Sequence, residues 1–146
     1  MAFSIRKMKE TDGNRICELA AQLGYEMDIA QFFGRVSLLN QNPNHSIWVA
    51  DSPETGVAAL IHLEKTIQLV SQPRLEVIAL VVDQKLRGSG LGKRLMRYAE
   101  SFAKSEDLSE ITLTTNVKRD ETHAFYEKIG FLKLKTSHRY LKILDL

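Results

Sequence analysis

A glycine-rich segment stands between an apolar run and an amphipathic stretch, and it constrains the fold more than any other part of the sequence. Residues 77–82 are uninterrupted and apolar, which predicts a buried strand. Over residues 91–103 apolar side chains recur at helical spacing, with charged side chains on the opposite face. Gly88, Gly90 and Gly92 lie at the junction. The sequence therefore predicts a strand, a tight turn and a helix in that order.

A turn of this kind exposes backbone N–H groups at the positive end of a helix, which favours a phosphate or pyrophosphate ligand. Two nucleotide-binding motifs do not fit it. A P-loop needs Ser or Thr where Arg94 stands, and a dinucleotide fingerprint needs a third glycine where Lys93 stands. The alternative is an ordinary strand-to-helix turn, whose glycines supply only the tight geometry.

Charge is concentrated around the same turn. Residues 83–104 contain six Lys or Arg and two acidic residues, which would attract an anionic ligand, although a solvated helix face gives the same pattern. The net charge of the whole chain is only +2, so we expect no nucleic-acid partner.

Length and composition favour one small globular domain covering residues 1–146. The longest apolar run has about six residues, far below the ~20 that span a bilayer, so no membrane association is expected. The single cysteine, Cys17, cannot form an internal disulfide and falls on the apolar face of a predicted helix. It is interpreted as a buried structural thiol, which fits a reducing cytoplasm.

The pattern along the chain predicts an α+β fold with a mixed central sheet. The first helix is capped by Thr11 or Asp12 and the second by Asp28, a third follows the glycine turn, and a fourth runs from about Asp120 to Gly130. The predicted strands are 3–8, 47–50, 57–63, 74–82, 110–115, 131–135 and 137–144.

Two motifs carry a resemblance to a known family. Arg87-x-x-Gly90-x-Gly92 resembles the pyrophosphate loop of the GCN5-related N-acetyltransferases (GNAT). Thr115-Asn116, followed by His123-Ala-Phe-Tyr126 and Gly130-Phe131, resembles the last motif of that superfamily, especially in small-amine enzymes such as aminoalkylphosphonate and aminoglycoside N-acetyltransferases. The resemblance implies a mostly antiparallel sheet of about seven strands flanked by about four helices, with acetyl-CoA as cosubstrate.

The same resemblance implies a set of cofactor-binding residues. The turn would hold the pyrophosphate, and the end of the preceding strand would hold the pantetheine arm if it diverges from its neighbour and leaves N–H groups unpaired. An unbroken buried strand would show the same residues. Asn116 would bind the pantetheine or order its own turn. The cofactor-binding set is Leu80, Val81, Val82, Arg87, Gly88, Ser89, Gly90, Leu91, Gly92 and Asn116.

Two residues are candidates for the chemistry. Glu76, at the start of the buried run, would take the proton from the attacking amine, although Glu64 or His62 on the preceding strand could reach the same cleft. Glu76 could also be a solvent-facing residue at a strand start. Tyr126 is implied as the acid that protonates the leaving thiolate, with a half-buried packing aromatic as the alternative.

The function expected from these features is transfer of an acetyl group from acetyl-CoA to a primary amine of a small molecule, by direct attack in a ternary complex. The alternatives are a catalytically silent acetyl-CoA-binding sensor and an acetyltransferase of protein amines. No metal is expected, although His62 and Glu64 could contribute ligands if a partner folded nearby. A homodimer is compatible with the family.

Overall fold

The computed structural model describes residues 2–115 and 120–146. The chain forms two compact units, Met1–Thr114 and Thr115–Leu146. Each unit is described by itself.

The first unit contains a five-stranded sheet with the strand order β1-β2-β3-β4-β5. Neighbouring strands are antiparallel except for β4 and β5, which run parallel. The sheet is thus mixed and mostly antiparallel, as predicted, and β4 has the bounds expected from the sequence. The strands are β1 (Ser4–Lys7), β2 (His45–Ser52), β3 (Gly56–Thr66), β4 (Arg74–Val82) and β5 (Ile111–Leu113).

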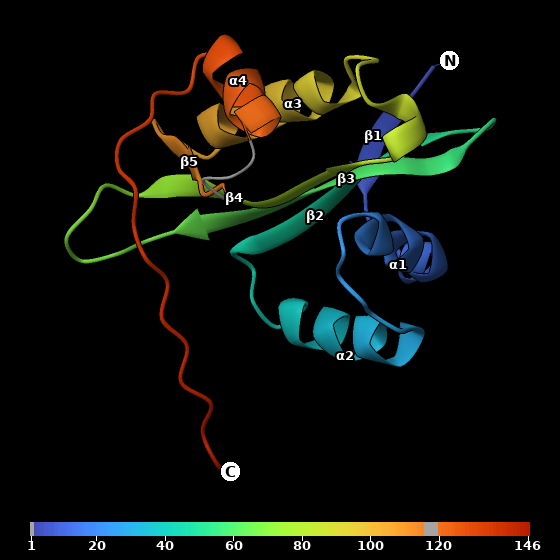
Figure 1. Ribbon diagram of the computed structural model, residues 1–146, viewed down its shortest axis with the longest axis horizontal. Coiled ribbons are helices and arrows are strands. Elements are labelled where there is room, and N and C mark those ends of the chain that lie inside the picture. The colour runs from blue at the N-terminus through green and yellow to red at the C-terminus, as the bar shows by residue number, and fades with distance from the viewer. Residues whose placement is uncertain (1, 116–119) are drawn as a thin grey trace. The chain divides into compact units, whose positions relative to one another are not determined.

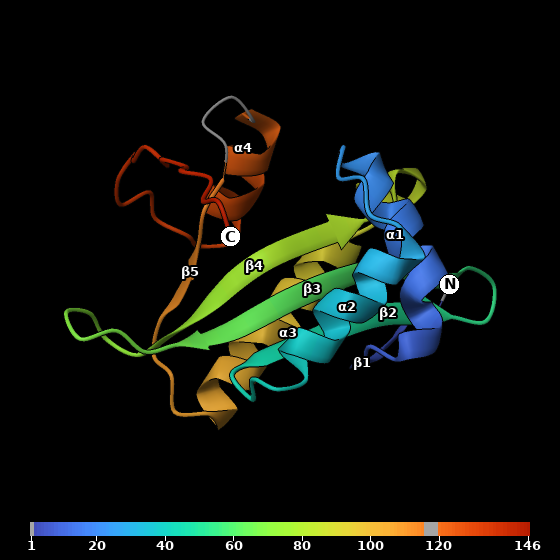
Figure 2. The same cartoon turned by 90° about the horizontal axis from the view of Figure 1, so that it is seen from below.

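Three α-helices cover the two faces of this sheet. Figures 1 and 2 show α1 (Gly13–Gln22) and α2 (Ile29–Leu39) on one face and α3 (Leu91–Ser105) on the other. Short 3-10 helices precede α1 (Glu10–Asp12) and α3 (Gln84–Leu86). The Asp28 side chain accepts a hydrogen bond from the Gln31 N–H and so caps α2, as its position in the sequence predicted.

The core lies between the sheet and these helices because the apolar stripe of each helix faces a strand. On the α1–α2 face, Leu19 is fully buried and packs with Phe32, Val49 and Leu60. On α3, Leu95 and Ala99 are fully buried. Truncating a core leucine such as Leu19 to alanine typically costs about 2–5 kcal/mol of stability.

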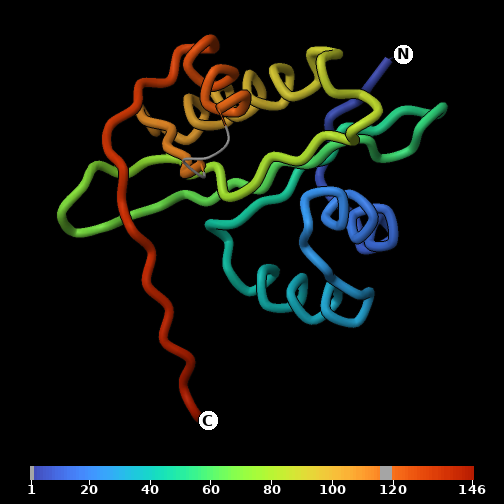
Figure 3. The backbone as a smooth tube through the Cα atoms, in the orientation of Figure 1, coloured from blue at the N-terminus to red at the C-terminus, as the bar shows by residue number. Residues whose placement is uncertain are grey.

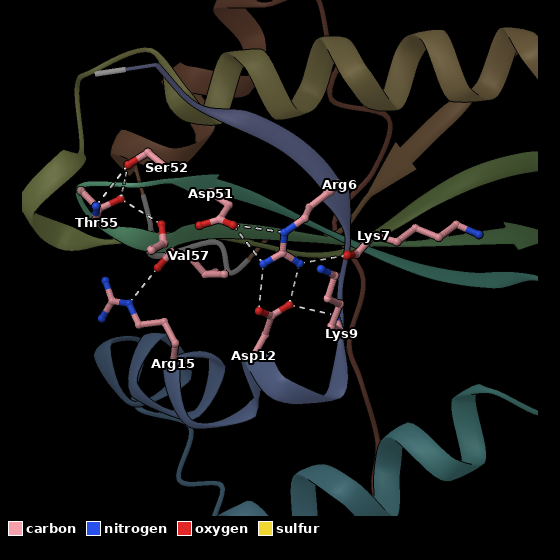
Figure 4. A network of polar contacts seen from close by, with 10 residues as sticks. Arg6, Lys7, Lys9, Asp12, Arg15, Asp51, Ser52, Thr55 and Val57 are labelled. Carbon is pink, nitrogen blue, oxygen red and sulfur yellow. Dashed lines mark hydrogen bonds and ion pairs between the residues drawn. The ribbon is translucent and has the colours of Figure 1, made fainter.

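A network of ion pairs joins β1 to the start of α1 (Figure 4). The Arg6 guanidinium donates to both carboxylate oxygens of Asp12 at 2.9 Å and to Asp51 at 3.1 Å. The hydrogen bond from Arg6 is the main reason that the pKa of Asp12 lies below its usual value. Because Asp12 is buried, this pairing prevents an uncompensated charge beneath the sheet edge.

The second unit contains α4 (Asp120–Lys128), which ends where Gly130 adopts a φ of +105°. The expectation of two closing strands at 131–135 and 137–144 is wrong, because residues 131–146 have no regular secondary structure. Their apolar side chains, among them Leu134 and Leu141, are exposed, so the alternating pattern has no buried face to fill. The described sheet therefore has five strands and not seven. The tube in Figure 3 follows the chain through both units.

None of the described helices has the length and apolar character needed to cross a membrane.

Candidate active site

The glycine turn has the backbone conformation that the sequence predicted. Gly88 has a φ of +80° and Gly90 a φ of +86°, and Gly90 directly precedes the first residue of α3. A Cβ at either position would meet no atom within 4 Å, so the left-handed conformation alone favours glycine here. The backbone conformation therefore shapes the turn, and the space that a side chain at Gly88 or Gly90 would enter is open.

The N–H groups at this turn are available to a ligand. The Ser89 N–H donates to the Leu86 carbonyl at 3.2 Å, and the Arg94 N–H to the Gly90 carbonyl at 3.1 Å. Within residues 2–115 and 120–146, no acceptor is recorded for the N–H groups of Leu91, Gly92 and Lys93. Unpaired donors at a helix N-terminus bind anions, so these residues fit a phosphate group.

Side chains of α1 contact the segment between β4 and the glycine turn. Asp83, at the end of β4, accepts hydrogen bonds from the Lys85 N–H at 3.0 Å and from Arg15, while Gln22 accepts from the Gln84 N–H at 2.9 Å. The Lys85 N–H and the Arg15 side chain are among the groups that lower the pKa of Asp83. Sequence reasoning missed these anchors.

A β-bulge divides β4 into two halves. The register pairs Ala79 with His62 and Val77 with Leu63, so Ile78 is an extra residue on β4. Pairing with β5 covers only Leu75–Val77 and stops at this bulge. In the described part of the chain, β4 from Ile78 onward therefore pairs on one side only, with β3.

The hydrogen-bond pattern fixes which backbone groups face the open edge of β4. The Asp83 N–H donates to the Ala58 carbonyl of β3 at 2.8 Å. Because alternate residues of an antiparallel strand face the same neighbour, Val81 faces β3, whereas Leu80 and Val82 direct their N–H groups to the open edge. Two of the three strand residues predicted to bind the cofactor thus present donors there.

Glu76 lies before the bulge in a polar cluster. Its Oε2 accepts from the Thr112 hydroxyl and lies 3.9 Å from the Nε of Arg74, which donates to Thr112 at 3.0 Å. No contact of the other oxygen, Oε1, is recorded among the described residues. The side chain is 21% exposed, so the carboxylate is held in place yet reachable. Thr112 and Arg74 carried no signal in the sequence.

The two alternative bases lie on the same face of the sheet as Glu76. Glu64 is the register partner of Glu76 on β3. One Glu64 oxygen lies 2.9 Å from the Nε2 of His45 and the other accepts from the Thr66 hydroxyl at 3.1 Å. The Nε2 of His62 lies 2.9 Å from the Nδ1 of His45. Burial, helped by His45, lowers the pKa of His62 to about 4.

The remaining predicted residues belong to the second unit or lie outside the described residues. Tyr126 is half-buried on α4, and its ring contacts those of Phe125 and Phe131. Asn116 lies outside the described residues. Among the residues that the structure describes, no group of three or more His, Cys, Asp or Glu side chains is placed to hold a metal ion. Cys17 is half-buried against the core, and burial raises the pKa of its thiol.

A strand with one open edge, a glycine turn and a helix with unpaired N–H groups thus follow one another in the first unit, and this arrangement suits an anionic ligand. The chain belongs to the acetyltransferase (GNAT) family, whose sequence model matches residues 12–131. This confirms the resemblance read from the two motifs.

Relatives and solved structures agree with this assignment. Human N-acetyltransferase 8B is 32% identical to this chain over an aligned region that covers 68% of this chain and 44% of that protein. The chain thus spans less than half the length of this relative. An uncharacterized N-acetyltransferase of Bacillus subtilis, YhdJ, is 26% identical over 77% of this chain and 80% of its own length. The fold matches an aminoglycoside antibiotic 6′-N-acetyltransferase from Acinetobacter haemolyticus with a TM-score of 0.82 at 20% identity, over 97% of this chain and 99% of that one.

Proposed function

We propose that this protein is an acetyl-CoA-dependent N-acetyltransferase that acts on a primary amine of a small molecule by direct attack in a ternary complex. Family membership supports the reaction class. The observation that carries the proposal is the glycine turn with unpaired N–H groups, which follows a strand whose edge is open beyond the bulge.

The first unit supplies the groups that would bind acetyl-CoA, which brings the activated acetyl thioester. The N–H groups from Leu91 to Lys93 and the positive end of α3 would bind the pyrophosphate, within the loop Arg87, Gly88, Ser89, Gly90, Leu91 and Gly92. Arg87 and Lys93 are exposed there and add positive charge. The open edge of β4 would receive the pantetheine arm in the manner of an added strand.

Glu76 is the proposed base. An amine arrives as an ammonium ion and must lose a proton before its lone pair can attack. One oxygen of Glu64 accepts a hydrogen bond from Thr66 and the other lies against His45, whereas Glu76 uses only Oε2 among the described contacts. This difference favours Glu76 over Glu64. As the acetyl carbonyl becomes an oxyanion, the N–H of Leu80 or Val82 could donate to it, and one such donor contributes about 10²–10³ in rate.

Tyr126 is the proposed acid for the leaving thiolate, and Asn116 a proposed ligand of the pantetheine. The family match supports both roles, because the matched residues 12–131 include Asn116 and Tyr126. A cytoplasmic location and a homodimer stay predictions.

A direct test is acetyl-CoA turnover with a panel of amines, read by release of free thiol. The panel contains ethanolamine, putrescine, aspartate, an aminoglycoside and a lysine-containing peptide, and CoA and acetyl-CoA binding are titrated in parallel. We expect turnover with at least one small amine. Turnover with the peptide alone would favour a protein acetyltransferase. Cofactor binding without turnover on any amine would favour a sensor.

Replacing Gly90 by alanine should weaken acetyl-CoA binding about tenfold or more. A left-handed L-residue costs about 1–2 kcal/mol, so the turn would relax and its N–H groups would no longer converge on one point. Isothermal titration with acetyl-CoA measures the effect. Gly24→Ala is the matched control, because Gly24 has a φ of +84°, open space around it and a position at the end of α1. Equal affinities for the two variants would refute a cofactor role for the turn.

A further inference from the structure

Three side chains on the α1–α2 face of the sheet form a chain of close polar contacts that begins at a carboxylate. His45, the first residue of β2, lies between Glu64 and His62 of β3. Its Nε2 lies 2.9 Å from Glu64 Oε2, and its Nδ1 lies 2.9 Å from His62 Nε2.

When His45 is neutral, the carboxylate sets the position of each proton in this chain. An ionised carboxylate can only accept, so the Nε2 of His45 carries a hydrogen. The Nδ1 of a neutral His45 is then an acceptor, and the Nε2 of His62 must donate to it. This leaves the Nδ1 of His62 with a lone pair. The low pKa of His62 agrees, because a neutral imidazole has one acceptor nitrogen at ordinary pH.

His62 and Glu76 lie on the same face of the sheet, on adjacent strands. Glu64 pairs with Glu76, and His62 pairs with Ala79, on the adjacent strands β3 and β4. Diagonal neighbours in such a pair are about 7–8 Å apart, within reach of long side chains. Ala79 lies on β4 directly opposite His62, on the same face as Glu76, and its side chain is only a methyl group. An ammonium group that donates hydrogen bonds of about 2.9 Å in two directions spans most of such a gap.

We propose that His62 binds the acceptor amine together with Glu76, by accepting an N–H hydrogen bond at its Nδ1, and that Glu64 and His45 hold His62 in this acceptor form. The inference rests on the proposed function, whose acceptor must be an amine. Glu76 takes the proton, and His62 orients the nitrogen through a second hydrogen.

The charges around this position suit a cationic acceptor. Glu64 and Glu76 place two carboxylates on this face, and one guanidinium, that of Arg74, lies 3.9 Å from Glu76. Arg35 is the one charged residue of α2, and it is exposed. His62 in its neutral acceptor form adds no positive charge that would repel an ammonium ion.

Nitrogen-15 spectra of histidine-labelled protein test the proposal without relying on turnover. Protonated and unprotonated ring nitrogens give well-separated signals, and His62→Asn identifies the signals of His62 by their loss. We expect the Nδ1 of His62 to be unprotonated and its signal to shift with methylammonium chloride. Tetramethylammonium chloride, which carries the same charge but no N–H donor, should leave it in place. The signals of His138, in the exposed C-terminal segment, should not change.

Steady-state kinetics give the second measurement. His62→Phe should raise the KM of the best amine in the panel about tenfold, as expected for the loss of one hydrogen bond to a charged group, with the KM of acetyl-CoA unchanged. His62→Asn keeps an acceptor close to the Nδ1 position and should recover most of the loss. His138→Phe is the control for the change of residue type.

Two results would overturn the inference: an Nδ1 that carries the proton in the wild-type protein, or equal responses to methylammonium and tetramethylammonium. Either leaves the proposed function intact if the wild type still acetylates an amine. Absence of turnover on every amine, with the methylammonium shift present, would instead refute the proposed function.

Discussion

Glu76→Gln should lower kcat/KM for the amine about 10²–10⁴-fold, because it removes the carboxylate that accepts the proton while keeping nearly the same shape. The amide can still accept from the Thr112 hydroxyl, so the cluster with Arg74 should stay assembled. The measurement is the pH profile of kcat/KM, in which the variant should lose the part of the profile that depends on this carboxylate. Acetyl-CoA affinity should stay at the wild-type value.

Glu64→Gln is the informative comparison, since Glu64 is the cross-strand partner of Glu76. Its effect should be smaller and expressed mainly in the KM of the amine, because Glu64 acts through His45 and His62. Glu100→Gln, on the exposed side of α3, is the control for loss of a carboxylate elsewhere. A Glu76→Gln enzyme with wild-type rate and pH dependence would remove Glu76 from the mechanism.

Tyr126→Phe should lower kcat about ten- to a hundredfold with little change in acetyl-CoA affinity, because it removes the acid proposed for the leaving thiolate and keeps the ring. The ring contacts with Phe125 and Phe131 should persist, because the variant keeps the ring. Single-turnover kinetics with acetyl-CoA and the amine measure the effect on the chemical step.

Tyr140→Phe provides a matched control, because Tyr140 is a tyrosine of the same unit with an exposed side chain. It should behave as wild type. If Tyr126→Phe also turns over at the wild-type rate, Tyr126 is a packing residue of α4 and another group, or water, protonates the thiolate.

The features that sequence reasoning predicted are those encoded locally. The glycines at 88 and 90, the start of α3 at Leu91 and the cap at Asp28 each depend on residues a few positions apart. Apolar periodicity likewise predicted β4 with its observed bounds. The same periodicity failed at 131–144, because alternation alone does not show whether a partner strand covers the apolar side chains.

The features that sequence reasoning missed depend on register and on contacts distant along the chain. Arg15 and Asp83 are 68 positions apart, and Gln22 and Gln84 are 62 apart, so neither anchor of the glycine turn is visible in a local pattern. The polar contacts of His45 depend on its alignment with Glu64 across β2 and β3. The roles of Glu76 and Tyr126 were inferred from the family pattern and stay predictions.

The extra residue Ile78 also changes which residues of β4 share a face of the sheet, the even-numbered ones before it and the odd-numbered ones after it. Before it, the even-numbered Glu76 shares a face with Glu64, and after it the odd-numbered Ala79 shares that same face with His62. Simple alternation would group Glu76 with Ile78 and Leu80, whereas the observed register groups it with Ala79 and Val81. Without this one residue β4 would pair one to one with β3, and Glu76 would still lie opposite Glu64, but the local bend of the strand where its pairing with β5 stops would be lost, so a single insertion shapes the edge beside the reacting face.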